Sequence, residues 1–146
     1  MNRMFAGTSF NQPVGNWDTS KVTDMKEMFE RAKEFNQPIG DWDVSQVTSM
    51  DDLFHGQKVG KEFNQDISKW DVSKVTNMQY MFFHSAFDQD ITGWNTASLP
   101  NDRASYRMFT GDGPWYQKYG RVGWSGFGDM NGPPSAWHIK AKAAGT

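Results

Sequence analysis

The chain has 146 residues, enough for one domain with a real core, and its formal net charge is only −2. So small a charge gives no indication of nucleic acid or of an acidic substrate as a partner. The absence of Cys excludes a disulfide framework and thiolate chemistry. No apolar run approaches the roughly 20 residues of a membrane span, and no targeting segment is visible.

Charge and apolar residues are both distributed unusually. Residues 1–100 carry 9 Lys and Arg against 14 Asp and Glu, whereas residues 101–146 carry 6 against 3. Leu occurs only at Leu53 and Leu99. We therefore expect a core built from Met, Phe and Trp, which are adaptable or aromatic.

One sequence pattern recurs along most of the chain. FNQPVGNWDTSKVTDM (10–25) returns as FNQPIGDWDVSQVTSM (35–50) and as FNQDISKWDVSKVTNM (63–78). A fourth, weaker copy begins at Phe87. The copies differ in length only in the segment just before the first Phe of the next copy. This segment is longest in HGQKVGKEF (55–63), which indicates a loop on one edge.

The chain begins in the middle of a turn. MNRMF (1–5) aligns with MKEMF (25–29), so the first turn lacks its own strand and has no cap. Open ends of stacked units need polar caps. We therefore expect that residues precede Met1 in the native protein or that a partner covers this end.

Within each turn we predict a strand, a helix and an extended return. SKVT (20–23) suits a very short strand, and Asp24 is a good helix N-cap with Glu27 three residues on. MKEMFERAKE (25–34) then places apolar residues at i, i+3, i+4 and i+7, which is typical of a helix. FNQPIGDWD (35–43) is the predicted return.

Such units bury their apolar faces only by stacking on one another. We predict parallel strands about 4.8 Å apart and an aromatic ladder in the core. The alternative is an exposed indole platform for sugars or bases, but the constant register of each Trp with an Ile favours the core. The predicted ladder comprises Trp17, Trp42, Trp70, Trp94, Phe10, Phe35, Phe63 and Phe87.

The last third departs from this pattern. Residues 99–110 are predicted to form a divergent fifth-turn helix, and 111–146 an irregular extension rich in Gly and aromatic residues. So many aromatic residues need burial, either as a cap on the last turn or in a partner. Its basic residues suit an acidic partner or an anionic lipid surface, or simply solubilise it. The candidate partner-binding residues are Trp115, Tyr116, Tyr119, Arg121, Trp124, Phe127, Trp137 and Lys140.

Two columns of polar residues accompany the aromatic ladder. Asn11, Asn36, Asn64 and Asp88 suit a stacked amide column, and Asp18, Asp43, Asp71 and Asn95 suit Asx-turns. A calcium site joining these columns with Asp66 or Asp90 is the alternative interpretation.

No catalytic, cofactor or metal site is predicted. His55, His84 and His138 have no metal-ligand spacing, and we interpret His55 and His84 as surface residues. No Ser, His and Asp constellation and no cluster of tunable pKa groups indicates an enzyme.

The pattern VTxMxxMFxxAxxFNQxIxxWDVS, over roughly residues 1–98, resembles a known family. It is similar to the repeat of a domain of unknown function first described in mycoplasma surface lipoproteins, related to BspA-like leucine-rich repeats and also found in marine microalgae. The resemblance implies a right-handed, leucine-rich-repeat-like solenoid, with binding or adhesion proposed and no catalysis established. No lipoprotein signal precedes the first copy.

The expected fold is therefore an α/β repeat solenoid of about four turns over 1–98, with short parallel strands and short helices. The expected function is a non-enzymatic protein-interaction or scaffold module, acting as a surface-binding protein or as a peripheral subunit of a larger assembly. By family analogy alone the compartment is the cell surface or an organelle, including a photosynthetic complex. Partners are expected at the extension and at the N-terminal edge. Carbohydrate binding or adhesion, and hydrolysis near His138 or the third-turn loop, are the alternatives.

Overall fold

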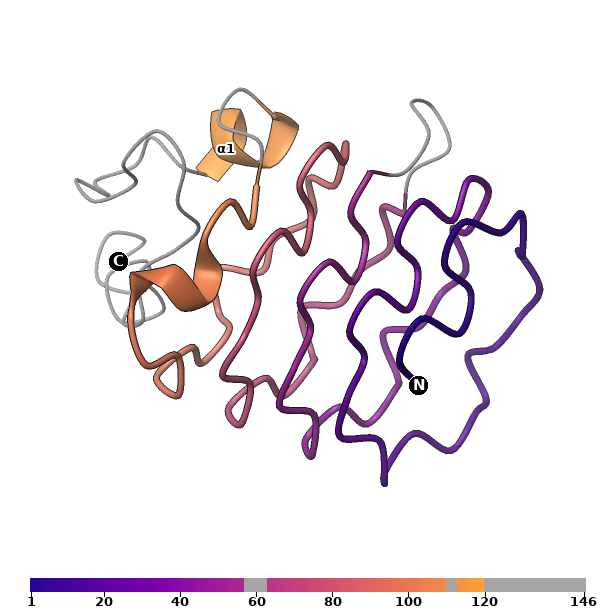
Figure 1. Cartoon of the computed structure of the whole chain (residues 1–146), viewed down its shortest axis with the longest axis horizontal. Coiled ribbons are helices and arrows are strands. Elements are labelled where there is room, and N and C mark those ends of the chain that lie inside the picture. The colour runs from indigo at the N-terminus through magenta and orange to yellow at the C-terminus, as the bar shows by residue number, and fades with distance from the viewer. Residues whose placement is uncertain (57–62, 110–112, 120–146) are drawn as a thin grey trace.

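A computed structural model describes residues 1–56, 63–109 and 113–119, without the side chains of Asp102 and Tyr116. The chain runs back and forth in coils that lie side by side, from the N-terminal coil at one end to the helix α1 at the other (Figure 1). We divide it into five coils. They span residues 1–23, 24–48, 49–76, 77–100 and 101–119.

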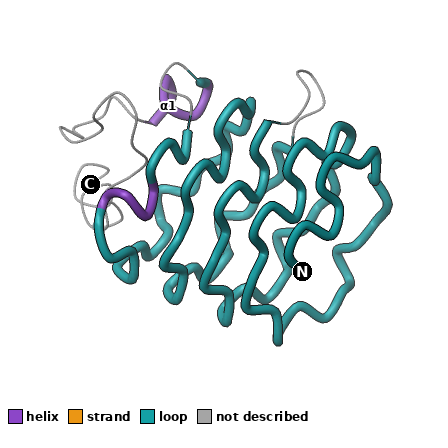
Figure 2. Tube along the Cα trace, in the orientation of Figure 1, coloured by secondary structure: helices purple, strands orange, loops and turns teal. Residues whose placement is uncertain are grey.

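The predicted solenoid of strands and helices is wrong. Among the described residues the only helices are the 3₁₀ helix η1 (Asp102–Ser105) and α1 (Pro114–Tyr119), both beyond the four predicted turns. The described residues of coils one to four form turns and extended segments, drawn as loop in Figure 2.

The predicted helix at 25–34 is instead a ribbon of tight turns. Glu27 and Arg31 have φ values of 53° and 52°, which a right-handed helix does not allow. The Glu27 N–H donates to the Asp51 carbonyl of the next coil (2.9 Å) rather than to its own turn. Alternate amides close the turns, as where the Met28 N–H donates to the Met25 carbonyl (3.2 Å). The amide partners therefore lie in two directions, and no helix forms.

In place of the predicted strands, single residues of neighbouring coils pair with one another. In the described residues the pairing consists of isolated parallel bridges, and no sheet forms. The Thr48 N–H still donates to the Thr23 carbonyl of the preceding coil (2.8 Å), but the Val47 N–H closes a turn on the Val44 carbonyl (2.9 Å), so the ladder does not extend along the Val-Thr segment. The bridges join Asp24 to Ser49, Ser49 to Asn77 and Phe82 to Phe109.

Each coil contains a ribbon equivalent to that of residues 25–34. Hydrogen bonds between successive ribbons hold the coils together. In coil one, the amides of Arg3, Phe5 and Gly7 donate to carbonyls of coil two at 2.7–3.0 Å. The same arrangement joins each later pair of ribbons. Every second amide of a ribbon thus binds the next coil, which sets a parallel register between coils.

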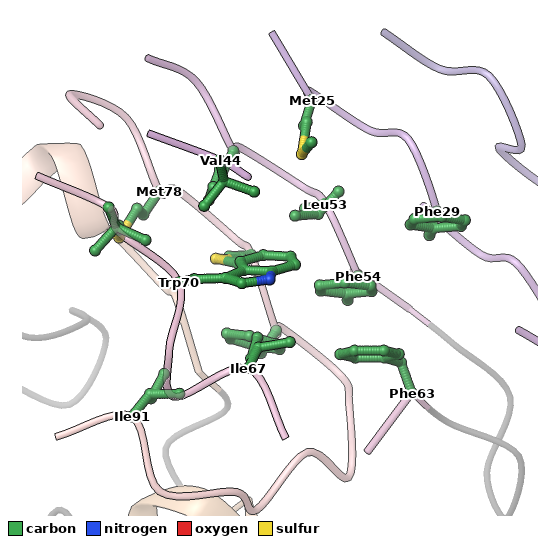
Figure 3. Close-up of a cluster of buried hydrophobic side chains, with 14 of the residues drawn as sticks. Met25, Phe29, Val44, Leu53, Phe54, Phe63, Ile67, Trp70, Met78 and Ile91 are labelled. Carbon is green, nitrogen blue, oxygen red and sulfur yellow. The ribbon is translucent and has the colours of Figure 1, made fainter. Parts of the chain in front are cut away.

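Stacked phenyl rings fill the interior. The ribbon Phe of each coil pairs with the Phe of its return, as Phe54 does with Phe63 at 4.1 Å between ring centroids. Phe54 also stacks on Phe29 of the preceding coil at 5.7 Å, with the rings almost parallel (Figure 3). Such pairs contribute about 0.5–1.5 kcal/mol each beyond their buried area.

The indole column forms the second wall of the core. Trp42, Trp70 and Trp94 are buried, and each Nε1–H donates to a carbonyl of the preceding coil at 2.9–3.1 Å. Phe35, Phe63 and Phe87 are buried as well. The two members of the predicted ladder in coil one, Phe10 and Trp17, are only partly buried.

Coil five replaces its return with α1. Of the range 99–110, predicted as a helix, only Asp102–Ser105 (η1) is helical within the described residues, and Phe109 then stacks on Phe82 at 5.4 Å between ring centroids. Trp115 of α1 stacks on Phe109 at 4.1 Å, the spacing that the ribbon and return phenyls have elsewhere. Although we expected the extension to be irregular, its first part is thus a short helix that continues the core.

Candidate docking surfaces

The outward residues of each ribbon occupy equivalent positions in every coil. One column has a positive φ throughout, from Arg3 and Glu27 through Asp52 and Tyr80 to Arg107, at 49–57°. A second column comprises Gly7, Arg31, Gly56 and His84 at 52–69°. Since the backbone is the same in each coil, the side chains at these positions can vary without changing the fold.

In coils one to three these outward positions are mostly charged and paired. The Lys26 ammonium lies 2.9 Å from the Asp51 carboxylate of the next coil, and this hydrogen bond raises the pKa of Lys26. Arg3 pairs with Glu27 in the same way. Ion pairs between these side chains therefore neutralise most of the charge on the ribbon surface of coils one to three.

In coils four and five, aromatic and basic residues occupy these outward positions. Tyr80 stands where coil two has Glu27, and Phe83 stands where coil two has Glu30. We call this surface the aromatic patch. It comprises Tyr80, Phe83, His84, Tyr106 and Arg107, together with His55 of coil three, whose ring contacts those of Tyr80, Phe83 and His84.

The members of the aromatic patch contact one another. The Tyr80 ring meets Phe83 and Tyr106 edge-on, both at 5.6 Å between centroids. The Arg107 guanidinium lies over Phe83 and Tyr106 at 5.5 and 5.4 Å, within reach of a cation–π interaction. Tyr80, Phe83 and Tyr106 are all partly exposed, and beside them Gln79, Arg103 and Tyr106 line a shallow, largely apolar hollow.

The imidazole of His55 lies at the edge of the aromatic patch. Its Nδ1 is 2.7 Å from the Asp52 carboxylate, and its ring lies 6.3 Å from that of His84. In the described residues no group of three His, Asp or Glu side chains could hold a metal ion.

The N-terminal face of coil one is a second surface. Met4 is 50% exposed, and Met1, Phe5, Phe10 and Trp17 are only partly buried. In the next coil the residue equivalent to Met4 is fully buried. The apolar interior therefore reaches the surface at this face.

The opposite face, on coil five, carries α1. Trp115 is 1% exposed and donates its Nε1–H to the Gln89 carbonyl (3.0 Å). The Lys118 ammonium lies 3.8 Å from the Asp88 carboxylate. The helix α1 therefore covers the apolar end of the stack.

The predicted partner-binding residues divide into two groups. Trp115 is in the core, and Tyr119 is half-buried against it at 5.2 Å between ring centroids. Tyr116 belongs to α1, but its side chain lies outside the described atoms. Outside the described residues altogether are Arg121, Trp124, Phe127, Trp137 and Lys140, as well as His138.

The first polar column is a hydrogen-bonded amide ladder. The Asn36 N–H donates to the Asn11 side-chain carbonyl (3.1 Å), and the Gln37 amide donates to the same group (2.9 Å). Asn64 and Asp88 continue the pattern. These amide groups are engaged in joining the coils.

The second polar column forms Asx-turns. Asp43 accepts from the Ser45 amide and hydroxyl at 3.0 and 2.6 Å, and these bonds lower its pKa. The pKa values of Asp18 and Asp71 are lowered in the same way by Ser20 and Ser73. Asp66, a suggested calcium ligand, is held in such a turn by Ser68 (2.9 Å).

Sequence reasoning missed the aromatic patch. Its signal was present, because Tyr80 and Phe83 break the charged pattern set by Glu27 and Glu30. A helix at that segment, as the sequence predicts, sets no register between the outward positions of different coils. Their alignment depends on the hydrogen bonds between ribbons.

The sequence profile of a protein family described as "Mycoplasma protein of unknown function, DUF285" matches residues 1–119. The match extends past residue 98 and includes η1 and α1. No curated protein and no solved structure matches the chain. Within the described residues, neither helix is long and apolar enough to cross a membrane.

Proposed function

The chain belongs to the family described as Mycoplasma protein of unknown function, DUF285, and on that premise we propose that it is a non-enzymatic protein-interaction module. The aromatic patch is the proposed contact surface. Membership of the wider BspA-like family, a role as a peripheral subunit or surface-binding protein, and an organellar or surface location are parts of this proposal.

The observation that carries the proposal is the change of chemistry at equivalent outward positions. The ribbon backbone accepts Glu27 and Glu30 in coil two, so the fold does not require aromatic residues at Tyr80 and Phe83. Tyr, Trp and Arg are the residues most enriched at the energetic centres of protein interfaces. A partly exposed cluster of Tyr80, Phe83 and Arg107 suits that use.

The alternatives have less support. Carbohydrate binding through the indole column requires accessible rings, but Trp42, Trp70 and Trp94 are 4%, 3% and 1% exposed. A hydrolase requires a nucleophile, a base and an orienting group in one cleft. Among the described residues the Asp and Asn columns are instead engaged in turns and in joining coils.

The test replaces the outward residues of coil four with those of coil two. The double variant Tyr80→Glu with Phe83→Glu removes the aromatic surface while keeping residues that this backbone accepts. Wild type and variant, each with a photo-cross-linking group at Gln79, are incubated with extract of cells that make the protein. We expect the wild type to give a discrete cross-linked partner and the variant to lose it, with binding weakened about tenfold or more.

The matched control is Glu27→Gln with Glu30→Gln, which changes the same two positions in coil two. This control should cross-link as the wild type does, and all three proteins should unfold at similar urea concentrations. Equal capture by the wild type and the Tyr80 and Phe83 variant would argue against the aromatic patch as the contact surface.

A further inference from the structure

The outward ribbon positions of coils four and five differ from those of coils one to three in charge as well as in aromatic content. Gln79 stands where coil three has Asp51, and Tyr80 stands where coil two has Glu27. No Asp or Glu occupies an outward ribbon position among the described residues of these two coils. The carboxylates that pair with Lys and Arg in the earlier coils therefore have no counterpart here.

Arg103 adds a positive charge beside this surface. The Ala104 carbonyl accepts an amide of coil four as the Asn77 carbonyl accepts one of coil three, at 2.6 and 2.9 Å. Arg103, just before Ala104, therefore stands where the chain has Thr76 before the ribbon of coil four. Arg103 is exposed and makes no ion pair with the part of the chain that the structure describes. This backbone position thus accepts a neutral residue, and the charge at Arg103 has no counter-charge within the described residues.

An apolar hollow lies beside Arg103 on the aromatic patch. Gln79, Arg103 and Tyr106 line this hollow, which has a volume of about 240 Å³. Pockets that hold small-molecule ligands usually have volumes of about 300–1,000 Å³. The hollow is smaller and shallow, so it suits one side chain of a partner better than a separate small molecule.

The ring of Tyr106 at the hollow is held by its neighbours. Tyr80 meets it edge-on at 5.6 Å between ring centroids, and the Arg107 guanidinium lies 5.4 Å from its centroid. A side chain that is already held loses little conformational freedom when a partner binds. This wall of the hollow is therefore in place before a partner arrives.

The earlier coils show which group pairs with cations at the ribbon surface. The Lys26 ammonium lies 2.9 Å from the Asp51 carboxylate, and Arg31 lies 3.6 Å from the carboxylate of Glu30. Arg and carboxylate groups form charge-assisted hydrogen bonds, which are roughly twice as strong as neutral ones. A carboxylate supplied by a partner would give Arg103 the pairing that these cations have within the chain.

We propose that the partner contacts the aromatic patch through an acidic segment. An aliphatic side chain of this segment enters the hollow beside Tyr106, and a neighbouring carboxylate pairs with Arg103. This inference rests on the proposed function, because it takes the aromatic patch as the contact surface and adds the chemistry of the partner. Residues 1–100 carry 9 Lys and Arg against 14 Asp and Glu, and this net negative charge disfavours docking of an acidic segment elsewhere on coils one to four.

The experiment uses the whole chain and three synthetic peptides with blocked ends. The acidic peptide is Gly-Glu-Glu-Leu-Glu-Glu-Gly, the neutral peptide has Gln in place of every Glu, and the third peptide has Gly in place of Leu. Each is added up to millimolar concentration, and the Gln79 and Tyr106 amides and the Arg103 side-chain N–H are followed by ¹H–¹⁵N NMR. We expect saturable shifts with the acidic peptide, and binding about tenfold weaker for the other two, which lack the charges or the apolar side chain.

Two variants test the role of the positive charge. Arg103→Thr introduces the residue that earlier coils have at this position, and should weaken binding of the acidic peptide about fivefold. The matched control, Lys21→Gln, removes one positive charge from coil one at a position where coil two has Gln46, and should bind as the wild type does. Raising the ionic strength from about 0.05 M to about 0.5 M should remove most of the preference for the acidic peptide, because salt screens the charges.

Three results would overturn the proposal. The first is an unmoved Tyr106 amide signal at millimolar acidic peptide, and the second is equal binding of the acidic and neutral peptides. The third is unchanged binding of the acidic peptide by the Arg103→Thr variant.

The photo-cross-link at Gln79 separates this proposal from the proposed function. The partner segment that the wild type captures is identified by mass spectrometry. Asp or Glu residues next to the cross-linked residue would support the proposal. A captured segment that is neutral or basic would overturn it, while the aromatic patch would stand as the contact surface.

Discussion

At the scale of single residues, short polar side chains fix the turns from which the coils are built. Asp18, Asp43 and Asp71 each follow a Trp and accept hydrogen bonds from a Ser two residues on. In coil four Asn95 does the same for the Ala97 amide (3.1 Å). The sequence predicted these Asx-turns, because the required residues are neighbours along the chain.

These carboxylates predict how stability depends on pH. Their pKa values are lowered in the folded state, chiefly by the Ser side-chain hydrogen bond and then by the Ser amide. A carboxyl pKa that is lower in the folded state stabilises the fold at pH values above the unfolded-state pKa of about 3.9. That stability is lost as the pH falls through the folded-state pKa values.

Urea unfolding between about pH 3 and pH 6 checks this expectation. The urea concentration at the midpoint of unfolding should decrease as the pH is lowered below about 4. The triple variant of Asp18, Asp43 and Asp71 to Asn keeps an acceptor, as Asn95 shows, and should lose part of this pH dependence. A wild-type midpoint that rises as the pH is lowered would contradict the assignment.

At the scale of the elements, the repeat spacing predicts which residues of successive coils lie over one another but not the conformation of each coil. The constant spacing from Phe to Trp identified which residues lie over one another, since equal spacing places them at equal positions in each coil. The helix prediction failed because Met25, Met28, Phe29 and Ala32 point inward in the ribbon as they would in a helix. What distinguishes the two is where the Glu27 amide donates, and its acceptor is in another coil.

The close approach of adjacent returns gives the second prediction. A Cβ at Gly40 would lie 2.5 Å from the Asp66 carbonyl oxygen of the next coil, whereas a Cβ at Gly93, in the return of coil four, has nothing within 4 Å. Gly40→Ala should therefore destabilise by about 1–3 kcal/mol, as overpacking does. Gly93→Ala should change stability by less than about 0.5 kcal/mol.

Urea midpoints of the two Gly variants, measured side by side, test the spacing of the returns. Because both variants add the same methyl group to the return of a coil, and only the one at Gly40 meets the next coil, the difference between them reports the contact with that coil. Equal effects of the two substitutions would show that the returns do not approach each other as described.

At the scale of the whole molecule, the two ends of the stack differ. The C-terminal end is covered by α1, whose Trp115 occupies the position that a return Phe has in other coils. The sequence suggested a cap from the density of aromatic residues after residue 111, but not which residue forms it. That choice depends on how η1 and α1 turn back, which no local pattern predicts.

The covering helix gives the third prediction. Trp115→Ala removes a buried indole and its hydrogen bond to Gln89, and should destabilise by about 3–5 kcal/mol. It should also increase binding of a hydrophobic dye, because Phe109 becomes accessible. Gln117→Ala, at an exposed position of the same helix, is the control and should have little effect. A Trp115→Ala protein as stable as the control would contradict this role of α1.

The central claim is that successive ribbons donate alternate amides to one another. NMR couplings across hydrogen bonds measure this directly, because each coupling identifies one donor nitrogen and one acceptor carbonyl. We predict couplings from the Glu27 nitrogen to the Asp51 carbonyl and from the Phe29 nitrogen to the Leu53 carbonyl. Couplings from these nitrogens to carbonyls four residues earlier in the chain would show a helix at 25–34 and would contradict the stack of coils.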